Sequence, residues 1–134
     1  MQIIITGGGG FIGQKLASAL LQSSQPFDEL LLVDINLPQR PVDSPRLRCI
    51  KADLTRPGAV ESLIGPDTGV VYHLAAIVSS HAEQDFSLGW QVNLDLTRRL
   101  LEACRASHPG IRFIFSSSGD SRVAACSRLA TTVD

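Results

Sequence analysis

The chain contains 134 residues, of which 44% are apolar and 19% are charged, the balance of an ordinary soluble globular domain. Its formal net charge of −1 gives no reason to expect nucleic acid or an anionic membrane as a partner. The opening stretch MQIIITGGGG has no basic flank and breaks into glycines, so neither a signal peptide nor a membrane span is expected. Three cysteines without CxxC spacing favour free thiols and a cytoplasmic protein over a disulfide framework or a zinc site.

Short apolar runs alternate with segments of helical periodicity along the chain. Strands are expected at 2–6, 30–34, 46–53, 69–76 and 111–116, and helices at 11–24, 55–64 and 87–107. Thr55 is the expected N-cap of the middle helix, with Pro57 in its first turn. The buried face of the first helix is expected to comprise Ile12, Leu16, Ala19, Leu20 and Ser23.

This alternation predicts an α/β fold, a three-layer doubly wound parallel sheet with strand order 3-2-1-4-5. A switch point then lies between strands one and four, and ligands bind there, outside the carboxyl ends of the strands. The glycines at 7–10, the pair Ala75 and Ala76, and the serines at 116–118 all fall at that edge.

The stretch TGGGGFIG at 6–13 holds two overlapping glycine patterns, one beginning at Gly7 and the other at Gly8, which share Gly10 and Gly13. An early glycine permits the positive φ of a tight turn, and Gly10 lets backbone amides approach a pyrophosphate. Gly13 lets the following helix pack closely on the strand. Such a pattern by itself also fits a plain tight turn.

The context of the glycines favours phosphate binding, because they follow a buried strand and open a helix. Phe11 and Ile12 lie at the N-terminus of that helix, where unpaired N–H groups and a partial positive charge face an anion. Asp34 ends the second strand, 21 residues after Gly13, and can accept hydrogen bonds from the adenosine ribose of NAD. It would repel the 2′-phosphate of NADP, although Arg40 nearby could tolerate that phosphate; the alternative is a solvated strand end.

Residues at the ends of strands three and four extend the candidate site. The Asp53 carboxylate could accept from the adenine amino group, with Leu54 against the ring, or Asp53 could instead cap the approach to the next helix. Ala75 and Ala76 would leave room for the cofactor, although sheet–helix packing explains their small size nearly as well. His73 lacks metal-ligand spacing and is expected to be a buried strand residue.

The pieces TGGGGFIG, LLLVD, KADLT, YHLAA, QVNLDLTRRLLEAC and FIFSSS, in this order, resemble the extended short-chain dehydrogenase/reductase superfamily in its NAD-dependent epimerase/dehydratase group. The resemblance covers residues 1–118 and implies a Rossmann fold that binds NAD. Residues 73–93 look like the bacterial D-erythronate dehydrogenase branch, whose members oxidise a C4 sugar acid. A homodimer and a small-molecule substrate, a sugar acid or a nucleotide sugar, are what the family implies.

Carried over residue by residue, the resemblance gives Asn93 a role in supporting the active site. Ser118 matches the catalytic serine that hydrogen-bonds the substrate oxygen, and Ser116 and Ser117 match positions beside the nicotinamide. Ser79 and Ser80 fall where substrate contacts begin, or are ordinary loop serines.

The family's general base, a Tyr-x-x-x-Lys pair, is missing from this sequence. Its one tyrosine, Tyr72, lies in a predicted strand, and its lysines are Lys15 and Lys51. Residues 119–134 do not match the family, so we expect a truncated or frame-shifted chain whose Rossmann fold is incomplete at the C-terminus. Without a partner helix, the long helix is expected to expose part of an apolar surface and to self-associate; that surface comprises Val92, Leu94, Leu96, Leu100, Leu101 and Ala103.

Three functions remain open on these grounds. The first is a sugar-acid dehydrogenase whose present chain lacks the base. The second is a nucleotide-sugar epimerase or dehydratase, which shares the cofactor-binding half. The third is a non-catalytic NAD-binding regulator.

Overall fold

A computed structural model of the chain describes residues 1–75 and 86–115, and for 86–92 the backbone alone. Within these residues it contains five strands, β1 (Gln2–Thr6), β2 (Glu29–Asp34), β3 (Leu47–Lys51), β4 (Thr68–His73) and β5 (Arg112–Phe115). The described helices are α1 (Phe11–Gln22), α2 (Ala59–Leu63) and α4 (Phe86–Ser107). All eight expected elements are therefore present, and the largest difference in their ends is the later start of α2. Among the described helices, none combines the length and the apolar character that a membrane-spanning helix requires.

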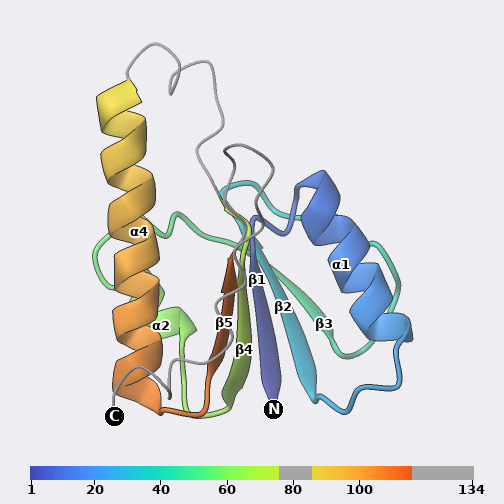
Figure 1. Cartoon of the computed structure of the whole chain (residues 1–134). Helices are drawn as coiled ribbons and strands as arrows, with labels where there is room; N and C mark the ends of the chain where they lie inside the picture. The colour runs from blue at the N-terminus through green and yellow to red at the C-terminus, as the bar shows by residue number, and fades with distance from the viewer. Residues whose placement is uncertain (76–85, 116–134) are drawn as a thin grey trace.

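The five strands form one parallel sheet in the order β3-β2-β1-β4-β5, which confirms the predicted doubly wound topology. Figure 1 shows α1 on one face of the sheet and α2 with α4 on the other, so the molecule has three layers. Because all strands run the same way, their carboxyl ends meet at one edge, at the top of Figure 1. The N-termini of α1 and α4 lie at that same edge.

The central strand β1 supplies apolar side chains to both layers of the core. Ile4 packs into the cluster under α2 and α4, whereas Ile3 and Ile5 pack into the cluster under α1. All three are at most 1% exposed. Full burial of a side chain of this size stabilises a fold by roughly 1.5–3 kcal/mol, so the uninterrupted apolar run makes β1 the centre of the sheet.

Helix α1 turns a different face to the sheet than its periodicity predicts. Its buried residues are Gly13, Ala17 and Leu20, with Leu16 partly buried beside them. Ile12 is 60% exposed, and Ala19 and Ser23 are also exposed, so their assignment to the buried face was wrong. The reason is the contact of Gly13 with the glycine loop, which fixes the rotation of the helix about its axis.

Helix α2 begins four residues later than predicted, and Thr55 is not its cap. The Thr55 hydroxyl donates to the Asp53 carboxylate at 2.6 Å and is thereby held in the preceding turn. Pro57 also precedes the helix, which starts at Ala59 after Gly58, whose φ is +78°. A threonine caps a helix when its hydroxyl accepts from the first amides of that helix. Here the hydroxyl bonds to the Asp53 carboxylate instead, and α2 has no side-chain cap bond.

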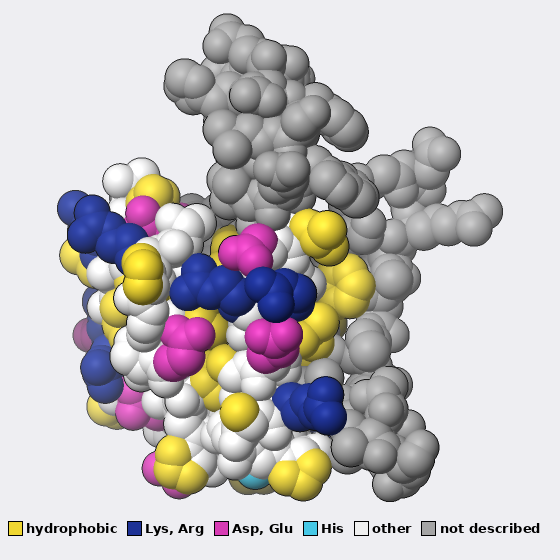
Figure 2. Space-filling model, turned by 90° about the vertical axis from the view of Figure 1, so that its left-hand side faces the viewer, with side chains coloured by type: hydrophobic (Ala, Val, Ile, Leu, Met, Phe, Trp, Pro, Cys, Tyr) yellow, Lys and Arg dark blue, Asp and Glu magenta, His cyan; other side chains and the backbone are white. Residues whose placement is uncertain are grey.

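Helix α4 covers the sheet with one row of apolar side chains, as expected, and carries charged side chains on its outer side. Leu96, Leu100 and Cys104 are buried against the sheet, and Leu94 is 57% exposed. Leu101 and Ala103 are half-buried, and the Val92 side chain lies outside the described residues. Figure 2 shows Lys and Arg side chains beside Asp and Glu side chains on this side of the molecule. The expected self-association through α4 stays a prediction.

His73 is buried, as predicted, and joins the carboxyl ends of β1 and β4. Its Nδ1 lies 2.7 Å from the Thr6 hydroxyl, which also accepts from the Ala75 amide at 3.3 Å. The hydroxyl has one proton and two lone pairs, so it can bond to Nδ1 in either tautomer of the ring while it accepts from the Ala75 amide. Burial, with the ring beside Phe113, lowers the pKa of His73 from its ordinary 6.5 to about 4.

This pKa shift predicts a loss of stability in weak acid. Between pH 6.5 and about 4, an unfolded chain protonates this imidazole and the folded chain does not. The free energy of unfolding should therefore fall as the pH drops through this window, by up to about 3 kcal/mol at its lower end. Urea denaturation at pH steps measures the slope, which His73→Gln should flatten; an equal slope in both proteins would contradict the assignment.

Candidate nucleotide-binding site

The glycine loop after β1 has the conformation of a phosphate-binding turn. Gly7 has a φ of +72°, and a Cβ atom there would lie 2.7 Å from the Ala75 amide nitrogen. Both facts exclude other residues at this position. Gly8 lacks a positive φ and packs instead on Leu32. Of the two overlapping patterns in the sequence, the one that begins at Gly7 therefore describes the turn.

The rest of the loop opens the N-terminus of α1 toward the sheet edge. The Gly10 amide donates to the Gly7 carbonyl at 3.1 Å, and Gly10 is the N-cap of the helix. A Cβ on Gly13 would lie 2.6 Å from the same carbonyl oxygen, so the helix can approach only because Gly13 has no side chain. Phe11 and Ile12 form the first turn, where amides have no acceptor within the helix. Because these amides are not bonded within the helix, an anion at this helix end would bind the backbone N–H groups of Phe11 and Ile12, whose side chains are exposed.

Asp34 stands at the carboxyl end of β2 with both carboxylate oxygens anchored. One oxygen accepts from the Gly9 amide at 2.9 Å and the other from the Ile35 amide at 2.7 Å. A Cβ on Gly9 would lie 2.9 Å from the first oxygen, so the third loop glycine makes room for the carboxylate. Because each carboxylate oxygen has a second lone pair, Asp34 can still accept from two ribose hydroxyls.

Arg40, the residue that could have favoured a 2′-phosphate, is engaged elsewhere. Its guanidinium donates to the Leu47 carbonyl at 3.1 Å and to the Ser44 carbonyl at 2.8 Å. It also lies 3.6 Å from the Asp43 carboxylate. These contacts hold Arg40 on the loop before β3, where its charge is already paired, and Asp34 remains the charge that a ribose would meet.

Asp53 follows β3 and folds the chain back on itself. One of its oxygens accepts from the Thr55 amide at 3.0 Å and from the Thr55 hydroxyl at 2.6 Å, and these bonds lower the pKa of Asp53. This arrangement closes the turn before α2 but does not cap the helix, whose N-cap is Gly58 without a side-chain cap bond. It leaves lone pairs on the second oxygen, which is 3.8 Å from the Arg56 guanidinium, so a contact with adenine stays possible. Leu54 is 7% exposed and lies in the cavity wall.

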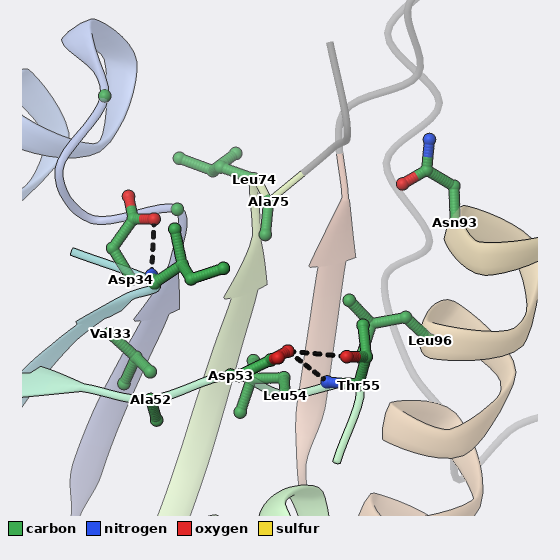
Figure 3. A pocket seen from close by; sticks show the side chains of 13 residues that line it. Val33, Asp34, Ala52, Asp53, Leu54, Thr55, Leu74, Ala75, Asn93 and Leu96 are labelled. Atoms are coloured by element: carbon green, nitrogen blue, oxygen red, sulfur yellow. Dashed lines mark hydrogen bonds between the residues drawn. The ribbon is translucent and has the colours of Figure 1, made fainter. Parts of the chain in front are cut away.

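These residues surround a cavity of about 540 Å³ between the glycine loop, the ends of β2 and β4, the turn after β3, and α4. Figure 3 shows Asp34, Asp53 and Ala75 around it, with Asn93 and Leu96 projecting from α4. Seven of the residues predicted for cofactor binding line the cavity, namely Gly7, Gly10, Asp34, Asp53, Leu54, Ala75 and Asn93.

Sequence reasoning missed several apolar lining residues. Ile35 lines the cavity and is 59% exposed. The signal in the sequence was its position directly after the strand-ending Asp34. Leu74 and Leu96 also line the cavity, but nothing in the sequence separates them from ordinary core leucines. These three side chains give the cavity the apolar walls that a planar base requires.

Several predicted site residues lie outside the described residues. They are Ala76, Ser79, Ser80, Ser116, Ser117, Ser118 and the segment 119–134. The structure therefore assembles the cofactor part of the predicted site and leaves the serine part untested. In residues 1–75 and 86–115, no group of three His, Cys, Asp or Glu side chains could hold a metal ion.

The residues present fit a dinucleotide. Backbone amides at the glycine loop suit a pyrophosphate, an anchored carboxylate suits ribose hydroxyls, and an apolar wall next to a second carboxylate suits an adenine ring. The three features occur in the order in which the parts of the adenosine half follow one another. The geometry supports NAD.

Comparisons with known proteins agree. A D-erythronate dehydrogenase of Haemophilus influenzae is 50% identical over 119 residues, which are 88% of this chain and 38% of the relative. A D-erythronate dehydrogenase of Cupriavidus necator is 45% identical over an alignment of 126 residues, and the match covers 88% of this chain and 39% of the relative. The chain thus spans less than two fifths of the length of these curated relatives.

Solved structures show the same architecture. A nucleoside-diphosphate-sugar epimerase from Agrobacterium tumefaciens is 31% identical with a TM-score of 0.76, over 98% of this chain and 45% of the other. A dTDP-glucose 4,6-dehydratase from Streptomyces venezuelae, solved with NAD bound, shares the fold at a TM-score of 0.70 and 24% identity, over 98% of this chain and 48% of the other.

The sequence profile described as the NAD dependent epimerase/dehydratase family matches residues 3–128, almost the whole chain. That match continues past residue 118, the predicted end of the resemblance, and the domain boundary at 118 stays a prediction. The fold, the glycine loop and the profile agree: the chain belongs to the NAD dependent epimerase/dehydratase family, and its cofactor is NAD.

Proposed function

We propose that this chain is the NAD-binding part of a dehydrogenase that oxidises a C4 sugar acid of the D-erythronate type. The observation that carries the proposal is the Asp34 carboxylate, anchored by two amides at the wall of the cavity and beside the glycine loop. The substrate class is supported by the two D-erythronate dehydrogenases at 45–50% identity. For the whole protein we expect a cytoplasmic homodimer.

Each described residue has a defined task in this proposal. Amides of the glycine loop and of Phe11 and Ile12 hold the pyrophosphate, and Asp34 accepts from the ribose. Asp53 accepts from the adenine amino group, while Leu54 contacts the ring. The chemistry that NAD supplies when bound is acceptance of a hydride from a carbinol carbon.

Residues nearer the reacting atoms complete the proposal. Ala75 and Ala76 leave space for the cofactor, Asn93 supports the active site from α4, and Ser116 lies beside the nicotinamide. Ser118 donates to or accepts from the substrate oxygen. These roles follow the resemblance, and for Ala76, Ser116 and Ser118 they concern residues outside the described part of the chain.

The proton of the substrate hydroxyl needs a base that this chain does not provide in the family's form. Tyr72 lies within β4, Lys51 ends β3, and Lys15 stands 4.7 Å above the Phe11 ring. No tyrosine in the sequence precedes a lysine by four positions. We therefore propose that the 134-residue chain binds NAD but needs the remaining length of its relatives for turnover.

A nucleotide-sugar epimerase is the second candidate. The specific observation in its favour is the 31% identity to the Agrobacterium tumefaciens epimerase over 98% of the chain. The cofactor-binding half is common to both functions, so the substrate must be tested directly. A regulator that binds NAD without catalysis is the third, and the absent Tyr-x-x-x-Lys pair allows it.

Gly7→Ala should weaken NAD binding at least tenfold. The added Cβ meets the Ala75 amide nitrogen at 2.7 Å, and a φ of +72° is strained for alanine. Isothermal titration calorimetry with NAD measures the effect. Gly65→Ala is the matched control, because a Cβ there has nothing within 4 Å and the backbone does not need glycine. Equal NAD affinity in the Gly7 variant and the wild type would rule out the proposed phosphate loop.

In Asp34→Asn, the ratio of the dissociation constant for NADP to that for NAD should fall at least tenfold. The substitution removes the charge that repels a 2′-phosphate and weakens acceptance from the ribose hydroxyls. The dissociation constants of both cofactors measure the ratio. Asp67→Asn, a change just before β4 at the opposite edge of the sheet, serves as control. An unchanged ratio in Asp34→Asn would show that the carboxylate does not meet the ribose.

The proposed division of labour predicts NAD binding without turnover. The 134-residue chain should bind NAD yet form no NADH from D-erythronate, because the tyrosine base is missing. Absorbance of NADH measures turnover. A chain extended to the length of the relatives should form NADH from D-erythronate and not from a nucleotide sugar. Turnover by the short chain would refute its proposed incompleteness, and epimerisation of a nucleotide sugar by the long one would favour the second candidate.

A further inference from the structure

We propose that Arg99 of α4 is a positioning residue that fixes the turn carrying Asp53 and Leu54, and thereby sets recognition of the adenine ring. The inference rests on the proposed function, since it takes Asp53 as the acceptor of the adenine amino group. Arg99 itself touches neither cofactor nor substrate in this scheme. It acts through the backbone of the turn.

The guanidinium of Arg99 binds three successive carbonyl oxygens of one turn. Its Nη1 donates to Leu54 at 3.4 Å and to Thr55 at 3.2 Å, and its Nη2 donates to Arg56 at 3.1 Å. The same Nη2 lies 3.9 Å from a carboxylate oxygen of Glu61 on α2. The Arg99 side chain is 18% exposed, so these bonds are partly shielded from water.

The turn depends on this cation because its carbonyls converge. Three neighbouring carbonyl dipoles that point at one place repel each other unless a donor with positive charge lies between them. On the inner side of the turn, the Asp53 carboxylate accepts from Thr55, and the Arg56 amide donates to the Asp53 carbonyl at 3.2 Å. Two sets of bonds thus hold the turn: those of Asp53 within the turn and those of Arg99 from α4.

One short stretch of α4 contributes both a side chain of the cavity wall, Leu96, and the side chain that binds the turn, Arg99. Leu96 lines the cavity together with Leu54, and Arg99 follows Leu96 by three residues, on nearly the same face of the helix. Figure 3 shows Leu96 projecting from α4 toward the turn at Leu54 and Thr55. A shift of the turn relative to α4 would therefore move the Asp53 carboxylate and the Leu54 wall together.

Arginine suits this position better than lysine. A planar guanidinium presents several N–H donors in a fixed fork, which can reach separate carbonyls at once, whereas an ammonium is a compact point charge. A lysine at this position should hold the turn only partly. The neighbouring Arg98 offers a natural comparison, because it pairs with Asp95 and Glu102 within α4 itself. The Arg98 side chain is 60% exposed, whereas that of Arg99 is 18% exposed.

The test compares NAD with its deaminated analogue, nicotinamide hypoxanthine dinucleotide, in which an oxygen replaces the adenine amino group. The wild-type 134-residue chain should bind NAD about tenfold more tightly than the analogue, since Asp53 accepts from that amino group. In Arg99→Met the ratio of the two dissociation constants should fall to about one, and in Arg99→Lys to an intermediate value. Arg98→Met should keep the wild-type ratio.

A ratio distinguishes positioning from a general loss of stability, which would weaken both dinucleotides equally. A wild-type ratio that persists in folded Arg99→Met overturns the inference. Where circular dichroism shows that this variant does not fold, Arg99→Lys decides, and an unchanged ratio in it overturns the inference as well. A wild-type chain that binds NAD but does not prefer it over the analogue overturns the Asp53 assignment, and one that binds neither overturns the proposed function.

Discussion

The close approach of Gly7 to the backbone of Ala75 is the contact on which the rest of the site depends. It lies between β1 and β4, where the connections of the sheet change direction, and it is possible only without a side chain. The bonds of Thr6 to His73 and to the Ala75 amide hold the same two strand ends from within the core. Gly13 then rests on the Gly7 carbonyl, so the direction of α1 follows from this junction.

From that junction the polar groups of the site are placed by backbone amides. Asp34 is fixed by Gly9 and Ile35, and Asp53 is fixed by Thr55. Acceptors held in this way lose little conformational freedom when a ligand binds, which favours affinity. The arrangement therefore suits the proposed binding of the adenosine half of NAD, with apolar side chains such as Leu54 and Leu96 in the wall of the same cavity.

The two cores explain how a chain that spans less than two fifths of its relatives still positions this edge. One cluster lies between the sheet and α1, and the other lies between the sheet and α2 with α4. Each strand that contributes to the cavity is backed by at least one of them. The proposed cofactor binding thus draws on contacts within residues 1–75 and 86–115, whereas the proposed proton transfer calls for groups beyond them.

The strand order was predictable from the sequence, and so was the position of the glycine loop and of Asp34 at one edge of the sheet, because buried apolar runs, glycines and a strand-ending acid are local signals. The rotation of α1, the late start of α2 and the choice between the two glycine patterns could be read only from the folded chain. The hydrogen bonds of Arg99 to the turn after Asp53 likewise join residues more than forty positions apart. The rotation of α1 depends on the contact of Gly13 with Gly7, and the start of α2 depends on the bond between Thr55 and Asp53 within one turn. Periodicity along the chain does not contain either contact.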